Sequence, residues 1–366
     1  MKPKQFARRL LGLLLVLLLL ASCAYNPETV LAVDGDSVKS GVYLYYQLMV
    51  VMNELTAAIE DGTQSAKDIL KDNPIVEGVA ARQWVQNKTT DYCKMHVFIE
   101  REFNRLGLSF SSIILSSYQS SIQEEWANAS SFLLNNGISY DSFEEVMLIT
   151  NYKRQSVMEA LYKYGGEKEI TVEEYDNYFH THYTKFDYLV LSLASMIDGM
   201  PLVEEFEERV VEIAEQLVER ANARSLDRAF LEFYPDIAEI IGDESEIDNN
   251  YYLSMVRENI VTNDTSTSPS EDLVKQLFAG QEDDESDGPA PDNAYKLFYQ
   301  EGNTLIIYRV VGLDDEDKYK DYETALRNAI AEEPFEKYIK LSIARYPMEI
   351  DERARGYYSV DKIRYS

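Results

Sequence analysis

The spacing of apolar residues predicts helices over most of residues 40–165. Between residues 92 and 106, apolar side chains recur every three or four positions, which places them on one face of a helix. The members of this stripe are Tyr92, Met95, Ile99, Phe103 and Leu106. We predict successive helices, separated by short turns, at 41–60, 76–107, 110–135 and 143–164.

Turn and cap signals divide this helical block. Two short strands, 30–33 and 36–38, are predicted to pair through an Asp34-Gly35 turn. Asp61-Gly62 ends the first of these helices, and a polar stretch follows up to Pro74. Asp141 and Ser142, followed by Glu144 and Glu145, form a capping-box pattern that predicts the start of the helix over 143–164.

Strands and helices alternate from Thr171 onward. Thr171 and Glu174 form another capping box, which predicts a short helix that ends near Tyr183. The apolar runs 186–193 and 304–311 predict buried strands. The other predicted elements are helices at 202–222, 226–234 (ended by Pro235), 268–278 (begun by Ser268, Pro269 and Ser270) and 318–345 (interrupted at Pro334), and a tail with a short strand.

The helix over 202–222 is predicted to be strongly amphipathic. Its apolar face consists of Val203, Phe206, Val210, Ile213 and Leu217, at spacings of three and four residues. Glutamates occupy the opposite face. We expect the apolar face to pack on a neighbouring element and the acidic face to be solvated.

The N-terminus has the pattern of an export signal. Four basic residues within positions 2–9 precede the apolar run Leu10–Leu20, which is too short to span a bilayer comfortably. Leu20-Ala21-Ser22-Cys23 follows and resembles the lipobox of bacterial lipoproteins. We therefore expect cleavage after residue 22 and lipidation of Cys23 with fatty acyl chains such as palmitate; two such chains suffice for stable anchoring. The alternative is an ordinary signal peptide with a chance cysteine.

Composition narrows the possible functions. The 366 residues include 64 acidic and 35 basic side chains, a formal charge of −29, and without the four basic residues of positions 1–22 the charge becomes 31 − 64 = −33. So acidic a surface repels phosphate, which argues against nucleic acid as a partner. There is no glycine-rich nucleotide loop, and two cysteines with three histidines exclude most zinc and iron–sulfur sites. We expect no cofactor and no metal.

The order of these elements resembles the PrsA/SurA-type extracytoplasmic foldases. The likeness is carried by Val33–Val38 before a tyrosine-rich helix, by Gly137–Glu144 with Glu169–Tyr175, and by Phe186–Leu193 with Gly302–Val311. The resemblance implies an α+β, mostly α fold, in which a discontinuous multi-helix chaperone module holds an inserted small parvulin-like α/β domain. The implied domains are a signal peptide at 1–22, a tether at 23–29, a helical module at 30–170, a degenerate parvulin-like domain at 171–313, and a C-terminal helix and tail at 314–366 that returns to the helical module.

The parvulin-like part departs from the family at its chemistry. The family's first strand carries a histidine where this chain has Tyr188, and its last strand carries a histidine where this chain has Leu305. The family's glycine-rich stretch and its catalytic Asp or Cys have no recognisable counterpart. No residue is therefore assigned as catalytic.

Other chemistry-bearing residues have plain structural interpretations. His180 and His182 are two positions apart on a predicted helix and cannot share a metal ion. His96 is interpreted as a satisfied structural histidine, and Cys93 as a small buried hydrophobe. The 27 tyrosines either pack helices together or line a groove for unfolded chains. The acidic pairs Glu207-Glu208 and Asp283-Asp284 lack calcium-loop spacing and are interpreted as solvated.

Three functions remain open. The first is a chaperone, anchored to the bacterial cell membrane from the outside, that assists newly secreted or unfolded polypeptides and lacks isomerase activity. The second is an active peptidyl-prolyl isomerase with unusual residues. The third is an interaction or assembly lipoprotein that has kept only the architecture.

Overall fold

The chain forms two compact units, each described by itself. The computed structural model describes residues 26–59, 64–195, 199–243, 255–263, 270–279, 294–300, 304–314 and 318–365. Unit 1 comprises the chain up to Glu169 together with the segment from Ala331 onward, and unit 2 runs from Ile170 to Ile330. The described residues are mostly helical, with small antiparallel sheets, as predicted for an α+β fold.

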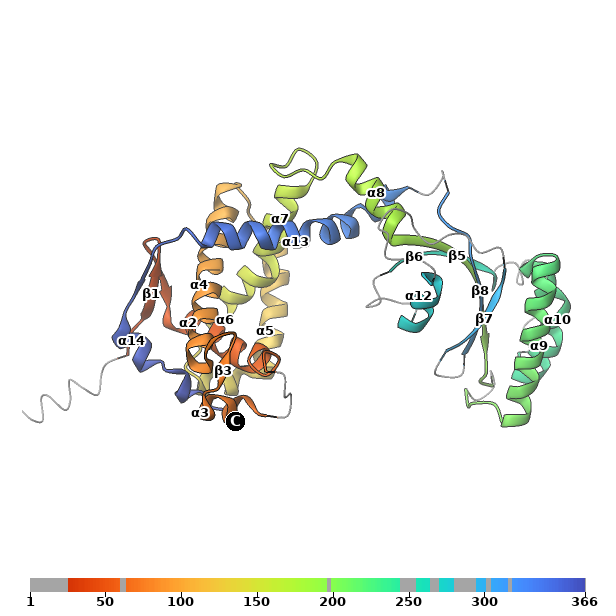
Figure 1. Ribbon diagram of the computed structural model, residues 1–366, viewed down its shortest axis with the longest axis horizontal. Coiled ribbons are helices and arrows are strands. Elements are labelled where there is room, and N and C mark those ends of the chain that lie inside the picture. The colour runs from red at the N-terminus through yellow and green to blue at the C-terminus, as the bar shows by residue number, and fades with distance from the viewer. Residues whose placement is uncertain are drawn as a thin grey trace, which may run out of the picture. The chain divides into compact units, whose positions relative to one another are not determined.

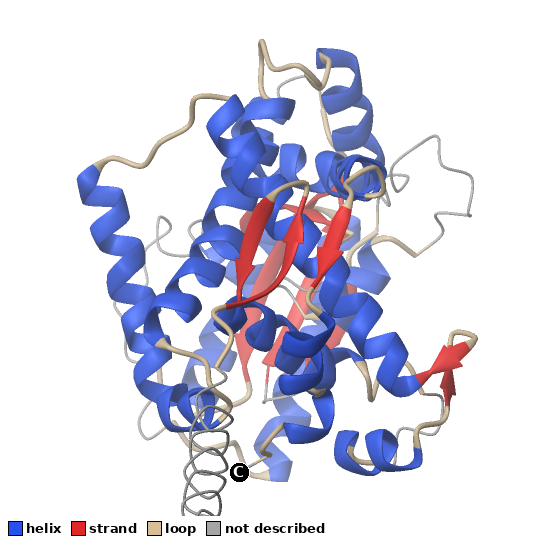
Figure 2. Cartoon of the chain, turned by 90° about the vertical axis from the view of Figure 1, so that its left-hand side faces the viewer, coloured by secondary structure: helices blue, strands red, loops and turns tan. Residues whose placement is uncertain are grey.

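Unit 1 begins with a β-hairpin, and a strand from the C-terminal tail extends it to a three-stranded sheet. The strands are β1 (Thr29–Val33), β2 (Asp36–Lys39) and β9 (Met348–Ile350), in the order β2-β1-β9. Asp34 and Gly35 both have positive φ, as a two-residue hairpin turn requires. The predicted hairpin and the predicted tail strand are both confirmed, and Figure 2 shows the three strands against the helices.

The first helices of unit 1 differ from the prediction near residue 76. The elements are α2 (Ser40–Met49), its π-helical continuation η1 (Val50–Glu54), α3 (Ala66–Asp72), β3 (Ile75–Val76), β4 (Val79–Ala80) and α4 (Ala81–Arg105). The long helix therefore begins at Ala81, because Glu77 and Gly78 adopt positive φ and turn the chain into a small hairpin. The polar stretch contains α3, whose N-cap is Ser65.

The remaining helices of unit 1 follow the predicted order. They are α5 (Ser112–Asn135), α6 (Tyr140–Met147), the π-helical turn η2 (Leu148–Lys153) and α7 (Arg154–Tyr162). The N-cap of α6 is Ser139, whose hydroxyl accepts from the backbone N–H of Ser142. The capping box predicted at Asp141 and Ser142 was therefore placed two to three residues too late.

Unit 2 is built around a four-stranded antiparallel sheet in the order β6-β5-β8-β7. Its elements are α8 (Val172–His182), β5 (Tyr183–Ser192), α9 (Glu204–Ala223), α10 (Leu226–Ile241), β6 (Arg257–Thr262), α12 (Glu271–Leu277), β7 (Lys296–Gln300), β8 (Thr304–Val310) and η3 (Tyr319–Tyr322). The Thr171–Glu174 capping box is confirmed, whereas α12 begins at Glu271 with Ser270 as its N-cap. Ser268 and Pro269 lie outside the described residues. The strands predicted at 186–193 and 304–311 are confirmed as a pair.

Both faces of this sheet are covered. Buried side chains of α9 and α10 pack with Leu189, Leu191, Leu305 and Ile307 on one face. On the other face, the core consists of strand residues Phe186, Phe298, Ile306, Tyr308, Val310 and Val261, with Leu273 and Leu277 from α12. Figure 1 shows α9 and α10 on one side of the strands and α12 on the other.

Two prolines lie inside helices that they were expected to break. Pro235 is part of α10, which continues to Ile241, and Pro334 is part of α13 (Glu323–Ile343). Each helix is anchored by buried side chains on both sides of its proline, such as Phe335 beside Pro334. This packing outweighs the one backbone hydrogen bond that each proline removes. The chain then ends with α14 (Glu352–Tyr357) and η4 (Val360–Lys362).

Candidate functional site

A groove in unit 1 lies between η1, α4 and the unit 1 part of α13. Its volume is about 480 Å³. The apolar lining residues are Tyr92, Met95, Ile339, Ile343 and Ala344, and the charged ones are Glu54, Lys88, Asp91, Lys94, Glu336 and Lys340. We call it the α4–α13 groove. We call the apolar lining residues its floor and the charged lining residues its rim. Apolar side chains that remain open to solvent beside charged ones are expected of a binding surface rather than of a closed core.

The groove contains residues of the apolar stripe of α4 that the core does not fully bury. Ile99 and Phe103, from the predicted stripe, are buried as expected. Tyr92 and Met95 are only half-buried, and both line the groove. Helix α13 supplies the facing wall, where Ile339 is buried and Ile343, one turn later, is half-buried. Ile99 and Phe103 of the stripe therefore belong to the core, and Tyr92 and Met95, earlier in the helix, line the groove.

The π-helical turn η1 brings a carboxylate to the groove. The backbone N–H of Leu55 donates to the carbonyl of Val50, five residues back, which is the wide π-helical spacing. Glu54, at the end of this turn, accepts a hydrogen bond of 2.7 Å from the Tyr92 hydroxyl. Burial, the hydrogen bond and the negative charge of Glu54 all raise the pKa of Tyr92 above its ordinary value. The phenol thus stays protonated and holds Glu54 at the rim.

Aromatic contacts and ion pairs hold α13 in place on unit 1. Tyr338 packs edge-on against Phe98, and Phe335 packs edge-on against Tyr162. Arg154 of α7 forms ion pairs with Glu332, at 2.8 Å, and with Glu336. The segment after Ala331 is thus bound to helices from the first half of the chain, and the groove wall is fixed.

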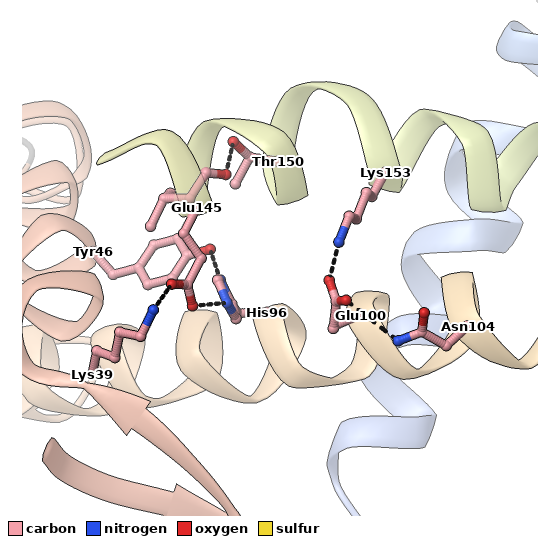
Figure 3. Close-up of polar contacts among 9 residues, drawn as sticks. Lys39, Tyr46, His96, Glu100, Asn104, Glu145, Thr150 and Lys153 are labelled. Carbon is pink, nitrogen blue, oxygen red and sulfur yellow. Dashed lines mark hydrogen bonds and ion pairs between the residues drawn. The ribbon is translucent and has the colours of Figure 1, made fainter. Parts of the chain in front are cut away.

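A partly buried polar network connects α2 and its N-cap residue Lys39 with α4 and α6 (Figure 3). The Tyr46 hydroxyl lies 3.0 Å from His96 Nδ1, and His96 Nε2 lies 3.4 Å from Glu145. Lys39 donates to the same carboxylate at 2.6 Å. In this geometry Nδ1 lies within hydrogen-bond reach of the Tyr46 hydroxyl, and Nε2 points at the Glu145 carboxylate. His96 is thus satisfied at both ring nitrogens, as predicted.

The charges and hydrogen bonds of this network stabilise the contact between the helices. Burial disfavours the charge on Glu145, but hydrogen bonds from His96 and Lys39 outweigh it and lower the pKa of Glu145 to about 2. Burial raises the pKa of Tyr46 well above its ordinary value. Figure 3 also shows a second contact between α4 and η2, where Lys153 pairs with Glu100, which accepts from Asn104. Tyr46 is fully buried and His96 almost so, whereas the side chains of Lys39 and Glu145 are 60% and 33% exposed, so the network ties helices together from the core outward to the surface.

The sheet of unit 2 does not bring Tyr188 and Leu305 together. Tyr188 lies opposite Tyr308 in the β5–β8 pair, on the face that α12 covers. Leu305 lies opposite Leu191, fully buried on the face that α9 and α10 cover. Alternation along a strand sends their side chains to opposite faces of the sheet. The two positions that the resemblance singles out therefore cannot form one site.

The α12-covered face carries aromatic and aliphatic side chains. Tyr188 stacks on Phe186, and the Tyr308 hydroxyl donates to Gln276 Oε1 of α12 at 2.8 Å. The sequence places none of its histidines on β5 or β8. On the opposite face, Arg309 pairs with Asp187 and lies over the ring of Tyr295. Burial and the charge of Asp187 raise the pKa of Tyr295 to about 12.

The remaining candidates occupy separate places. His180 and His182 lie on helix α8, as predicted, where His182 stacks on Tyr178 and His180 lies beside Asp176. Within the described part of the chain, no group of three or more His, Cys, Asp or Glu is placed to hold a metal ion. Glu207 and Glu208 belong to α9, and Asp283-Asp284 lies outside the described residues.

Tyrosines near the chain start pack helices together. Tyr43 and Tyr46 are almost fully buried, and Tyr45 packs edge-on against Phe143. Among the tyrosines that the structure describes, Tyr92 lines the α4–α13 groove. The packing interpretation is therefore confirmed for the tyrosines of α2, and a groove for unfolded chains stays a prediction. No sequence signal distinguished the two, because both need the same residue type.

The two cysteines differ in what the structure shows. Cys93 is free, fully buried in α4, and burial raises the pKa of its thiol, so its interpretation as a small hydrophobe is confirmed. Cys23 and the apolar run Leu10–Leu20 lie outside the described residues. Among the helices that the structure describes, none combines the length and apolarity needed to cross a bilayer.

Comparison with known proteins gives similarity in structure only. No protein-family model and no curated protein matches the sequence. The foldase protein PrsA of Streptococcus pneumoniae aligns at 12% identity and a TM-score of 0.38, over 89% of this chain and 97% of its own. A Campylobacter jejuni structure, from the pair PEB4 and Cj1289 described as structurally related SurA-like chaperones, aligns at 10% identity and a TM-score of 0.26, over 89% and 100%. Both scores are low, so these likenesses assign no function to this chain.

Proposed function

We propose that this protein is an extracytoplasmic chaperone, anchored to the bacterial cell membrane through Cys23, that holds unfolded or newly secreted polypeptides in the α4–α13 groove. The observation that carries the proposal is the groove itself, an apolar floor left open to solvent within a helical unit. Apolar surface that is exposed to water binds apolar side chains and does not require a particular client sequence, because the hydrophobic effect is non-directional. Unfolded chains expose such side chains and folded ones do not.

The charged rim supports broad rather than selective binding. The lining includes three carboxylates, Glu54, Asp91 and Glu336, and three lysines, Lys88, Lys94 and Lys340. Because the lining holds as many carboxylates as lysines, the groove carries no net charge that would strongly repel acidic or basic segments. The groove is therefore suited to clients of varied sequence.

We propose further that unit 2 lacks isomerase activity. Prolyl isomerisation has a barrier of roughly 20 kcal/mol, and a catalyst must offer preorganised polar groups in a partly desolvated pocket. The positions expected to carry paired histidines hold Tyr188 and Leu305, on opposite faces of the sheet. A proline-containing test peptide should therefore isomerise at the uncatalysed rate, and acceleration comparable to that by an intact parvulin would contradict this part of the proposal.

The groove is tested by suppression of client aggregation. The pair Met95→Ser and Ile343→Ser removes apolar area from its floor. The matched control is Ile113→Ser, on α5, where the isoleucine is 81% exposed and does not line the groove. We expect the wild type and the control to suppress aggregation of a reduced, unfolded model protein, and the groove pair to lose most of that protection.

Two results would contradict the chaperone function. The first is a wild-type protein that gives no protection, which would favour the interaction or assembly lipoprotein. The second is equal binding of folded and unfolded clients. If Ile113→Ser lowers protection as much as the groove pair does, the groove is not the binding site. Thermal unfolding of each variant, measured in parallel, separates lost binding from lost folding.

The anchor has its own test. Cys23 follows the small residues Ala21 and Ser22 and would accept the lipid through its thiol. Cys23→Ser is expected to release the protein from the membrane fraction or to leave the precursor uncleaved. Unchanged fractionation with normal processing would contradict lipidation and would support the ordinary signal peptide.

A further inference from the structure

The apolar face of α9 extends beyond the core that it packs against. Val210 and Leu217, from the predicted face, are buried against the sheet and α10, together with Ala214 and Ala221. Val203, the N-cap residue, and Phe206 in the first turn are instead 63% and 42% exposed. The core ends about one turn before the apolar pattern does.

Two further exposed apolar side chains adjoin this turn. Met200, in the chain that leads into α9, is 62% exposed, and Tyr299 of β7 is 51% exposed. The Tyr299 hydroxyl donates to Glu207, which joins β7 to the first turn of α9. The backbone N–H of Leu202 donates to the carbonyl of Leu193 at 2.8 Å, so the entry to α9 is fixed on the end of β5. We call Met200, Val203, Phe206 and Tyr299 the α9–β7 patch.

The surroundings of the patch are strongly acidic. Helix α9 carries seven glutamates (204, 205, 207, 208, 212, 215 and 219) against the two arginines 209 and 220. Four of these glutamates fall within the first turns, among the apolar residues of the patch, and Glu204, Glu205 and Glu208 are exposed. This setting differs from the rim of the α4–α13 groove, where carboxylates and lysines are equal in number.

We propose that the α9–β7 patch binds extended segments of unfolded polypeptide that combine lysine or arginine with aromatic or aliphatic residues. The inference rests on the proposed chaperone function for its class of client, but it concerns a second surface in the other unit. The apolar side chains of the segment cover Val203, Phe206 and Met200. Its cations lie among the surrounding carboxylates, which attract them from a distance that depends on salt.

The charge of the patch also selects against other occupants. A second copy of this chain would bring another acidic patch, and like charges across an interface are costly. An acidic segment is repelled for the same reason. A metal ion would need carboxylates that converge, and no such group is found within the residues that the structure describes. A cationic, apolar segment is the occupant that satisfies both features of the surface.

The test measures binding of labelled, disordered peptides to the full chain by fluorescence anisotropy. One peptide combines lysine, phenylalanine and serine, and its partner replaces each lysine with glutamate. The apolar variant is Val203→Ser with Phe206→Ser. The charge variant is Glu204→Gln, Glu205→Gln and Glu208→Gln, and its matched control is Glu212→Gln, Glu215→Gln and Glu219→Gln on the same helix.

We expect the wild type to bind the lysine peptide more tightly than the glutamate peptide. The apolar variant should raise the Kd about tenfold, as expected when a contact residue is truncated. The charge variant should raise it about threefold to tenfold at low salt and less at high salt, as screening predicts. The matched control should change it less than twofold.

Several outcomes would overturn the inference. These are equal binding of the two peptides, no change in the apolar variant, or equal effects of the charge variant and its control. The pair Met95→Ser and Ile343→Ser keeps the two proposals distinct, since it should remove most of the aggregation suppression and leave peptide binding at the α9–β7 patch unchanged. If the wild type does not suppress aggregation but the lysine peptide still binds at the α9–β7 patch, the proposed function is contradicted and the inference about the α9–β7 patch is retained.

Discussion

The sheet of unit 2 and the groove of unit 1 use similar side chains in opposite ways. Aromatic and aliphatic residues fill both faces of the sheet, where α9 and α10 cover one face and α12 covers the other. In the groove, residues of the same kinds, such as Tyr92 and Ile343, remain half-exposed between helices. Apolar area that another element covers stabilises the fold, whereas area left open is available to a partner. Substitutions in the sheet should therefore change stability, and substitutions in the groove should change binding.

The largest expected effect comes from placing a histidine in the sheet at Leu305→His. Leu305 is fully buried in an apolar cluster, so the imidazole loses packing and has no polar partner there. We expect unit 2 to lose about 2–5 kcal/mol of unfolding free energy, with no gain of isomerase activity. Denaturant unfolding measures the first and a peptide assay the second. The volume-conserving control Leu305→Met should cost less than about 1.5 kcal/mol. A stable, active Leu305→His variant would show that the sheet is a catalytic face.

The next effect concerns the packing that holds unit 1 together, at Gly41→Ala. A Cβ at Gly41 would lie 2.2 Å from Ser142 Oγ and 2.7 Å from its Cβ, so α2 and α6 would have to separate. We expect a loss of about 1–3 kcal/mol, measured by thermal unfolding. The matched control is Gly356→Ala in α14, where nothing lies within 4 Å and helix propensity favours alanine. Equal stability of the two variants would show that the α2–α6 contact is looser than the structure has it.

A smaller effect is expected on the pH dependence of the unfolding free energy of unit 1, to which Glu145 contributes. Its pKa is lowered from 4.5 to about 2 in the folded chain, so its stabilising contribution is complete above pH 4.5. That contribution is lost as the pH falls from 4.5 towards 2, because the unfolded chain takes up the proton first. We expect Glu145→Gln to cost about 1–2 kcal/mol at neutral pH, after allowance for solvent screening.

The pH profile distinguishes this effect from a simple loss of packing. The difference in unfolding free energy between wild type and Glu145→Gln should shrink as the pH falls below 4.5. Lys39→Met removes one of the two partners that lower the pKa of Glu145, so the acid-sensitive window should move to higher pH. A difference that stays constant from pH 7 to pH 2 would argue against the network. Because the sheet of unit 2 lacks this network, the comparison separates the two units.

The smallest expected effect is the loss of one hydrogen bond at the α12-covered face. Tyr308→Phe removes the hydroxyl that donates to Gln276 and should cost about 1 kcal/mol of unfolding free energy. Tyr188→Phe is the matched control on the adjacent strand, and it should change stability by less than about 0.5 kcal/mol. Neither change should alter aggregation suppression. A loss of protection in Tyr308→Phe at full stability would move client binding to the sheet.

Local chemistry in the sequence was enough to determine several elements. The Asp34-Gly35 turn and the apolar residues beside it define the first hairpin, because a two-residue turn with positive φ pairs only adjacent strands. The Thr171–Glu174 capping box defines the start of α8, since both of its hydrogen bonds join residues three apart. The helical spacing of apolar residues likewise predicted α5 and α9 to within a few residues.

Tertiary packing decided what local chemistry left open. Pro235 and Pro334 stay inside helices because distant side chains hold both helices in place, which the prolines' own neighbourhood does not reveal. Tyr188 and Leu305 point to opposite faces because the register of β5 with β8 is a long-range property. The groove and the α9–β7 patch were not predicted either, because the spacing of apolar residues shows that a helix has an apolar face but not which part of that face another element buries. Local hydrogen bonds and periodicity act over a few residues, whereas exposure depends on which segments far apart in the chain pack together.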